Sequence, residues 1–286
     1  MKKTGKVFVA GSANAARNAI VRRLRARGLR DHQIDTRAEY KLNLCDQLAV
    51  RAYLREEMPE QIYITAGPWG NHSDSNERRG THMADALLGP LQLIHEAMYA
   101  GVKKLLLVAA HQVYGNWAVL PIAEEDLTYA RPENARAPLA IAHTLGISLC
   151  EAYTHEFAEV LGLQYRSVVV GHVFGPGEDS ETFALGELQA LMRHIHQANL
   201  FKLSSVSIRS NGFRRLDWLY VDDMAEACIQ VLDMPEREHQ ALTRPNHYHI
   251  NLCGGRTHSK LELAEAIAGL VGYKGRLIVE SGRIQK

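Results

Sequence analysis

This sequence lacks a surplus of charge of either sign. Its 286 residues include 33 lysines and arginines and 32 aspartates and glutamates, so the formal net charge is only +1. Non-specific binding to nucleic acid needs a basic surplus that displaces counterions from the phosphates, so this balance argues against a nucleic-acid partner. The one local basic run, at residues 22–27, is interpreted as the solvated face of a helix.

Long apolar runs are also lacking. No stretch reaches the roughly 20 apolar residues that cross a bilayer. The apolar run after the N-terminal lysines is too short for a secretory signal. The four cysteines are widely spread and form no Cys-x-x-Cys pair, a pattern typical of reduced thiols in the cytoplasm. We therefore expect a cytoplasmic protein with no membrane partner.

The sequence also lacks clusters of residues that could bind a metal. His194 and His196 lie two positions apart in a predicted helix, where such side chains point in different directions. His247 and His249 lie beside a predicted strand and could share one of its faces, but no carboxylate or third histidine is evident near them. We predict no metal site and interpret these histidines as structural or surface residues.

The sequence does contain a regular alternation of strands and helices. Short apolar runs predict buried strands, and apolar residues at helical spacing predict helices that end at Gly28 and Gly101. The predicted strands are residues 6–10, 61–66, 103–110 and 164–171, and the predicted helices are residues 15–27, 81–100 and 139–161. Repeated strand–helix units of this kind predict an α/β fold, a doubly wound parallel sheet of the Rossmann type. A further helix is predicted after Leu219, with Asp222 or Asp223 as its N-cap.

Several motifs follow one another in an order that resembles a known family. They lie at residues 138–143, 146–153, 165–168, 174–176, 249–252 and 272–276. Together they resemble the GDP-L-fucose synthases, which are extended short-chain dehydrogenases/reductases, and the resemblance covers essentially the whole chain. It implies a dinucleotide-binding domain at residues 1–173. It also implies a smaller, truncated substrate-binding domain at residues 174–286, interleaved with the first.

The loop after the first predicted strand departs from the glycine pattern of a dinucleotide site. The family spaces three glycines as Gly-x-x-Gly-x-x-Gly, and this sequence has Gly11, Asn14 and Arg17 at those positions. Asn14 is a tolerable substitute because asparagine enters left-handed backbone more readily than most residues. Arg17 either turns to solvent or points toward a phosphate. The loop is therefore either a weakened or altered nucleotide site or a plain strand-to-helix turn without a ligand.

Other residues match cofactor contacts of the family. Arg37 resembles the arginine that pairs with the ribose phosphate of NADP, and its alternative is an exposed loop arginine. Asp46 resembles the aspartate that meets the adenine, and its alternative is a helix cap. Ala66 and Gly67 end a predicted strand where the backbone passes beneath the adenosine. The resemblance thus implies NADP or NAD as cofactor, bound weakly or not at all where the pattern is broken.

The reductase chemistry of the family needs a tyrosine, a lysine and a serine or threonine, and other residues stand at those positions here. The resemblance places Leu139 at the tyrosine, His143 at the cofactor-holding lysine and Ala110 at the serine. It places Gln112 at the cysteine and Gly186 at the histidine that act in epimerisation. Leucine cannot donate or accept a proton, and loss of even one acid or base lowers a rate by about 10²–10⁴-fold. We therefore expect the standard reductase mechanism to be missing.

Substitute residues are the alternative to lost catalysis. His111, Gln112 and Tyr114 follow the fourth strand, and they join His143 and His172 as candidates for bordering one cleft. Histidine can serve as acid or base near neutral pH. The competing interpretation is structural, with Tyr114 packed beneath the fourth strand and His143 half-buried and bonded to backbone.

Candidates for substrate binding lie mainly in the second half of the chain. The resemblance implies such a role for His172 and Arg193, and also for Arg214 and Arg215, which lie close to a displaced diphosphate-binding arginine. The implied ligand is a GDP-linked deoxysugar. The resemblance also implies a homodimer, in which the predicted helices at 81–100 and 139–161 form a four-helix interface.

Three functional hypotheses follow. The favoured one is a relative of the nucleotide-sugar reductases that has lost the reductase chemistry and serves as a binding or regulatory protein in polysaccharide or deoxysugar metabolism. The second is an active nucleotide-sugar epimerase or reductase with replaced catalytic residues. The third is a structural protein with an empty cleft.

Overall fold

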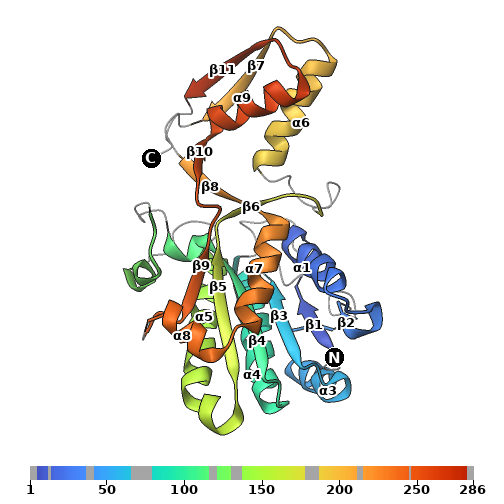
Figure 1. Cartoon of the computed structure of the whole chain (residues 1–286), viewed down its shortest axis with the longest axis vertical. Coiled ribbons are helices and arrows are strands. Elements are labelled where there is room, and N and C mark those ends of the chain that lie inside the picture. Colours follow the sequence, from blue (N-terminus) through green and yellow to red (C-terminus); the bar gives the residue numbers. More distant parts are fainter. Residues whose placement is uncertain are drawn as a thin grey trace.

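The computed structural model describes residues 5–11, 14–36, 42–65, 79–115, 121–129, 137–177, 187–210, 215–244 and 246–281. Within these residues the chain forms a large lobe, which holds the main sheet, and a small lobe at its carboxyl edge (Figure 1). Candidate residues Arg37, Ala66, Gly67, Gly186 and Arg214 lie outside the described residues.

Six parallel strands form the sheet of the large lobe, in the order β2-β1-β3-β4-β5-β9. Their bounds are β1 Val7–Ala10, β2 Ile34–Asp35, β3 Gln61–Thr65, β4 Lys104–Ala110, β5 Gln164–Val170 and β9 His249–Leu252. After β1 the chain first adds a strand on one side and then crosses to the other. This reversal places a switch point between β1 and β3, where doubly wound folds bind ligands beyond the carboxyl ends of the strands.

Helices cover both faces of this sheet, as continuous apolar strands require. One face carries α3 (Gln47–Glu57), α4 (Arg79–Tyr99) and α5 (Ala137–Leu161), and the other carries α1 (Ala15–Ala26) and α7 (Val221–Asp233). Alternate residues of β4 supply the two cores, because Leu105 and Leu107 face α3–α5 whereas Leu106 and Val108 face α1 and α7. The predicted doubly wound α/β fold is confirmed.

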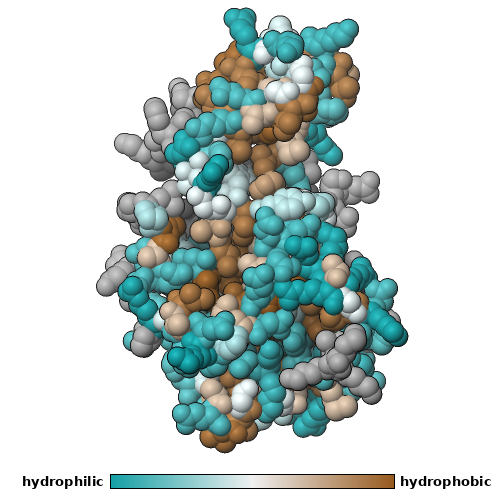
Figure 2. All heavy atoms as spheres, in the orientation of Figure 1, coloured by the Kyte–Doolittle hydropathy of each residue, from teal (hydrophilic) through white to brown (hydrophobic). Residues whose placement is uncertain are grey.

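The small lobe has its own core between two helices and short strands. Its helices are α6 (Glu187–Leu200) and α9 (Lys260–Val271), and their apolar faces pack together around Ile195 and Ala264. Strands β10 (Thr257–Ser259), β8 (Arg215–Tyr220) and β6 (His172–Phe174) form one sheet, and β11 (Arg276–Ser281) pairs with β7 (Ser205–Ser210). Figure 2 shows apolar side chains gathered on this lobe.

The two lobes share the second half of the chain. After β8 the chain returns to the large lobe through α7, α8 (Glu236–Leu242) and β9, and it enters the small lobe again at β10. Helix α7 begins after Tyr220, which makes no side-chain cap. The expected N-cap role of Asp222 or Asp223 is therefore wrong: both lie in the first helical turn, where a carboxylate still interacts favourably with the helix dipole.

The basic run at residues 22–27 belongs to an interface and not to a freely solvated face. Arg22 pairs with Asp222 at 2.5 Å, and Arg27 pairs with Glu226 at 2.5 Å and with Asp233 at 3.2 Å. These acids all lie on α7, so α1 and α7 are joined by ion pairs above their shared apolar core. Figure 2 shows a largely hydrophilic surface over these two helices.

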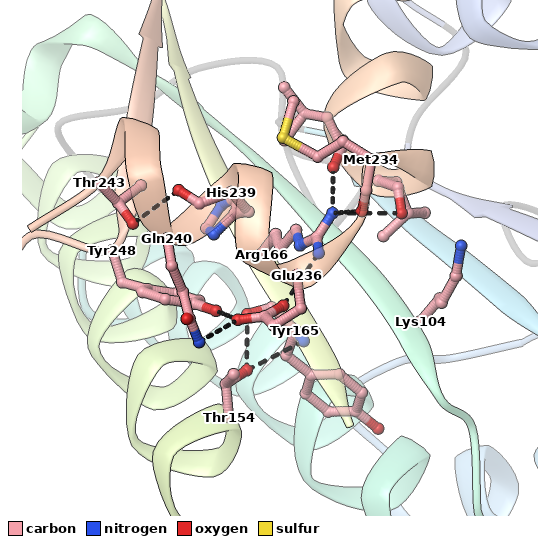
Figure 3. Close-up of polar contacts among 12 residues, drawn as sticks. Lys104, Thr154, Tyr165, Arg166, Met234, Glu236, His239, Gln240, Thr243 and Tyr248 are labelled. Carbon is pink, nitrogen blue, oxygen red and sulfur yellow. Dashed lines mark hydrogen bonds and ion pairs between the residues drawn. The ribbon is translucent and has the colours of Figure 1, made fainter. Parts of the chain in front are cut away.

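A buried arginine of β5, the strand beside the edge strand β9, ties the returning segment to the sheet. Arg166 of β5 is fully buried, and its Nη1 donates to the carbonyls of Val231 at 2.5 Å and Met234 at 2.8 Å. Its Nη2 donates to Glu236 Oε2 at 2.9 Å. Figure 3 shows the guanidinium meeting the end of α7 and the start of α8. The arginine thereby satisfies carbonyls at the C-terminus of α7, where a cation is also favoured by the helix dipole.

Glu236 and Tyr248 extend this network toward β9. Burial alone would raise the pKa of Glu236, but hydrogen bonds from Tyr248 and Arg166 outweigh it, and the pKa is lowered. His239 is fully buried against the Tyr248 ring, with centroids 4.5 Å apart. Burial, and secondarily the nearby Arg166, lower the pKa of His239 to about 4, so this histidine is neutral near pH 7.

We expect Arg166→Met to lower the free energy of unfolding by about 3–5 kcal/mol, because it leaves Glu236 half-buried without its cation and strips several carbonyls of their donor. Urea denaturation at pH 7 measures this. Arg25→Met is the matched control, since the Arg25–Asp31 pair is exposed and its loss should cost at most about 1 kcal/mol. Equal effects of the two substitutions would contradict the role assigned to Arg166.

Candidate functional site

The candidate site lies along the carboxyl edge of the sheet, between the two lobes. Gly11 follows β1, Thr36 follows β2, His111 follows β4 and Gly171 follows β5. The strands are parallel, so these positions come to one edge although they are far apart in the sequence.

Gly11 is required where it stands. Its φ is +130°, and a Cβ there would lie 2.2 Å from Oγ1 of Thr65 and 2.8 Å from the Thr65 carbonyl oxygen. The first glycine of the expected pattern therefore lets β1 end close against β3. Because this reason is internal to the fold, the glycine alone does not indicate a ligand.

Asn14 acts as a helix cap. Its side-chain oxygen accepts a hydrogen bond from the Arg17 main-chain N–H at 2.9 Å, and its own backbone is extended, with φ −115°. The left-handed conformation that would explain an asparagine in place of the second glycine is thus not adopted. Asp46 behaves in the same way, because its carboxylate accepts from Ala49 N–H at 3.1 Å and caps α3.

Arg17 does not turn to solvent, which was one of the two expected alternatives. It is only 7% exposed, and its Nη2 donates to the carbonyl oxygen of Thr36 at 3.0 Å. The side chain therefore reaches from the first turn of α1 to the end of β2. In doubly wound folds the residue about 20 positions beyond the glycine loop, at the end of this strand, contacts the adenosine ribose.

His143 is held by the backbone of the fourth strand. Its ring is 2% exposed, and Nδ1 accepts a hydrogen bond from Ala110 N–H at 3.1 Å. Since Nδ1 must keep its lone pair for this bond, the imidazole is neutral, and burial lowers its pKa to about 4. His143 is thus more buried than the half-buried residue expected. The position that the resemblance gives to a lysine therefore carries no cation near neutral pH.

Leu139 precedes His143 by one helical turn in α5. Residues four apart lie on the same face of a helix, so Leu139 is directed to the same side as His143. Its side chain is half-buried and has no group that exchanges a proton. The pair thus presents an alkyl group and a neutral ring at the end of β4, beside the methyl group of Ala110.

Tyr114 is turned away from this group and toward β9. Its hydroxyl donates to Asn251 Oδ1 at 2.7 Å and lies 2.9 Å from His249 Nε2. Burial raises the pKa of Tyr114 well above its usual range, and burial likewise lowers the pKa of His249 to about 4. Asn251 in turn bonds Glu124 and Ile122. The tyrosine thus fastens β9 and a surface turn to the end of β4, which is a structural role.

Two histidines do meet at the sheet edge. The rings of His111 and His172 stack with centroids 4.2 Å apart, and His172 also lies 5.3 Å from the Trp218 ring. Beside them, the side-chain oxygen of Gln112 is buried without a hydrogen-bond partner among the described residues. This stack joins the end of β4 to β6 and β8 of the small lobe. It is the one place among the described residues where the candidate substitute residues come together.

The candidate substrate arginines are in the small lobe. Arg193 is exposed on α6. Arg215 begins β8 and is already bonded, to Glu262 Oε1 at 2.8 Å and to the Thr257 carbonyl at 2.7 Å. A diphosphate would have to compete with these contacts of Arg215, so Arg215 forms no ready anion site in this arrangement.

Sequence patterns did not identify several partners at this edge. Thr36, Asn251 and Trp218 complete the contacts of Arg17, Tyr114 and His172. Each partner comes from a strand or loop that pairs only in the folded sheet, so no local motif indicates it. The signal available was weaker: Asn251 lies within a motif already noted for the resemblance.

The comparisons with known proteins agree with this geometry. The model of the family named "NAD dependent epimerase/dehydratase family" matches residues 7–251. The chain belongs to this family. It is 32% identical to GDP-L-fucose synthase of Escherichia coli K12 over 278 residues, covering 97% of this chain and 85% of that protein. It is also 32% identical to GDP-L-fucose synthase 1 of Arabidopsis thaliana, covering 96% of this chain and 80% of the relative.

Solved structures share the fold. A GDP-D-glycero-L-gluco-heptose synthase from Campylobacter jejuni, solved in the presence of NADPH, superposes with a TM-score of 0.84 at 24% identity, covering 98% of this chain and 89% of that one. A GDP-L-fucose synthetase from Naegleria fowleri bound to NADP has a TM-score of 0.79 at 16% identity, covering 98% and 83%. The predicted resemblance to the GDP-L-fucose synthases is therefore confirmed.

In the described parts of the chain, no group of three or more histidine, cysteine, aspartate or glutamate side chains is placed to hold a metal ion. None of the helices described is both long and apolar enough to cross a membrane.

Stability should fall as the pH drops below about 6.5. Three buried histidines, His143, His239 and His249, have pKa values lowered to about 4, whereas an unfolded histidine titrates near 6.5. Between these values the unfolded state binds more protons, so acid favours unfolding by up to about 1.4 kcal/mol per pH unit for each histidine. Above pH 6.5 this penalty is absent.

NMR of the histidine rings measures the titration directly, and urea denaturation at pH 7, 6 and 5 measures its effect on stability. The ring of His32, an exposed surface histidine, is recorded in the same spectra for comparison. A His143 ring that protonates at or above pH 6.5 would refute its assignment as a neutral acceptor of the Ala110 N–H.

Proposed function

We propose that this protein binds a dinucleotide or a nucleotide sugar without carrying out the standard reductase chemistry of its family. It would act as a binding or regulatory protein in polysaccharide or deoxysugar metabolism. The observation that carries the proposal is the bond from Ala110 N–H to the buried Nδ1 of His143. That bond needs a neutral imidazole at the position where the resemblance expects a lysine.

The residues at the three substituted positions each lack a different group that the reductase mechanism needs. In the family the tyrosine is the acid, the lysine lowers the pKa of that tyrosine and holds the nicotinamide ribose, and the serine polarises the carbonyl. Leu139 and Ala110 offer neither a proton nor a hydrogen bond from their side chains, and His143 offers no charge at neutral pH. The tyrosine, lysine and serine of the family act together on one carbonyl. The residues that remain here would therefore not support the same reaction, even at a reduced rate.

The proposed ligand class comes from the relatives. Their names describe enzymes of GDP-L-fucose and of a GDP-linked heptose, so a GDP-linked deoxysugar is the ligand we propose. The proposed cofactor is NADP or NAD, bound weakly or not at all, because the glycine pattern of the first loop is reduced to Gly11.

A second candidate function rests on the stacked pair His111 and His172. Two imidazoles at the sheet edge could exchange protons with a sugar, as an epimerase requires. We rank this candidate second because Leu139, His143 and Ala110 stand where the family has its reductase tyrosine, lysine and serine. An epimerase built on the two histidines would therefore follow a different mechanism.

We also propose a homodimer formed through α4 and α5. These helices expose large apolar side chains despite their packing on the sheet: Leu88 is 45% exposed, Tyr99 67% and Leu145 47%. Burying such a surface against a second copy is the expected use of two adjacent helices with exposed apolar residues.

Light scattering after size-exclusion chromatography tests the dimer. We expect a dimeric mass for the wild type and a monomeric mass for Leu88→Glu/Leu145→Glu, because buried glutamates would be desolvated in the interface. Leu270→Glu is the control, since Leu270 is 87% exposed on α9 in the small lobe and should leave the mass unchanged. A monomeric wild type would contradict the proposal.

The proposed function predicts binding without turnover. Calorimetry should detect GDP-mannose or another GDP-sugar, while NADPH oxidation with a GDP-linked 4-keto-6-deoxymannose should not exceed the rate without protein. The triple variant Ala110→Ser/Leu139→Tyr/His143→Lys should gain NADPH oxidation if the surrounding cleft remains usable. Robust turnover by the wild type would overturn the proposal, and absence of any GDP-sugar binding would favour the empty scaffold instead.

A further inference from the structure

Arg17 is an unusual residue for its place in the fold. It stands where a dinucleotide loop has its third glycine, a residue that normally lets the first helix lie close to the first strand. A long cationic side chain there would be expected to extend into solvent, as Arg25 of the same helix does at 55% side-chain exposure. Instead Arg17 is 7% exposed.

The guanidinium is directed to a specific place. Nη2 donates to the Thr36 carbonyl at 3.0 Å, so the side chain crosses from the first turn of α1 to the end of β2. Strand β2 pairs with β1 in parallel register, with Phe8 opposite Asp35, so Thr36 lies at the carboxyl edge beside the glycine loop. This is the corner where a doubly wound fold contacts the adenosine ribose.

The helix that carries Arg17 is fixed on its other side. The next residue, Asn18, donates from Nδ2 to the Gly177 carbonyl at 2.9 Å. A Cβ on Gly177 would lie 3.3 Å from Asn18 Cβ and 3.0 Å from Arg22 Nη1, so the loop after β6 lies tightly on α1. The Arg22–Asp222 pair adds a second tie. The first turn of α1 therefore cannot shift away to make room, and only rotation of the Arg17 side chain would open the corner.

We propose that Arg17 is a built-in occupant of the adenosine-ribose corner and excludes a dinucleotide from it. The inference rests on the proposed function in one respect, since it explains the weak or absent cofactor binding proposed there. It makes Arg17 a residue that decides whether the fold accepts a nicotinamide dinucleotide at all.

The opposite role for Arg17 would be recognition of the 2′-phosphate of NADP. A guanidinium that recognises a phosphate presents two parallel N–H groups to it. Here the group is buried, and one of its terminal nitrogens is bonded to a main-chain carbonyl. The contact with Thr36 therefore favours occupation of the corner over recognition of a ligand. The two roles predict opposite effects when the guanidinium is removed.

Calorimetry with NADPH and with NADH on Arg17→Ala tests the proposal. We expect both dinucleotides to bind at least about tenfold more tightly than to the wild type, a change of about 1.4 kcal/mol. Arg17→Gly, which restores the family residue, should behave alike. Arg25→Ala is the matched control on the same helix and should change neither affinity. Thermal unfolding and circular dichroism of each variant establish that it is folded.

Two results would overturn the inference. Unchanged affinity in folded Arg17→Ala would show that the side chain excludes nothing. Weaker binding, confined to NADPH and not shared by NADH, would show that Arg17 recognises the 2′-phosphate.

Failure of the proposed function is distinguishable from failure of this inference. If the wild type oxidises NADPH with a keto-sugar, and Arg17→Ala lowers KM for NADPH at the same kcat, the proposed function fails and the role of Arg17 stands. If no variant turns over and Arg17→Ala binds no more tightly, the role of Arg17 fails and the proposed function stands.

Discussion

The arrangement of the two lobes depends on one buried cation, Arg166. It lies on β5, and its guanidinium bonds the last carbonyls of α7 and the first residue of α8. Those segments bring the chain back from the small lobe to β9. The guanidinium therefore fixes the path by which the chain returns to the large lobe (Figures 1 and 3). A buried arginine is tolerated because several carbonyls and Glu236 replace its water.

At the carboxyl edge several polar side chains are bonded to the backbone or to one another. His143 accepts from the β4 backbone, Tyr114 is bonded by β9, Arg17 donates to the carbonyl after β2, and Asn14 caps α1. In an enzyme site some polar groups are kept for the substrate at a cost in stability. The corresponding positions here contribute to folding instead.

The sequence predicts the architecture well because periodicity and glycine stops are local signals. The strand at 103–110 and the helix at 139–161 correspond to β4 and α5 within two residues at each end. For the candidate site, sequence patterns name candidate residues but not the contacts that those residues make. The neutral state of His143 depends on the Ala110 N–H, which is 33 residues away along the chain, and the burial of Arg17 depends on Thr36. The N-cap expected at Asp222 or Asp223 failed because the helix begins at Val221, before both residues, and Arg22 pairs with the Asp222 carboxylate.

Similarity to the GDP-L-fucose synthases is carried by residues whose contacts here are structural. Gly146 lies so close to β4 that a Cβ would be 2.7 Å from Leu107 Cδ2, and a Cβ on Gly175 would be 2.5 Å from Val221 Cγ1. Arg166 joins β5 to the end of α7, and Tyr114 joins the end of β4 to β9. Packing of this kind keeps its residue requirements whether or not the site turns over a substrate. The identity of 32% is therefore evidence for the fold and, through the relatives, for the ligand class. Turnover depends on a different and much smaller set of side chains, on which the overall identity carries no information.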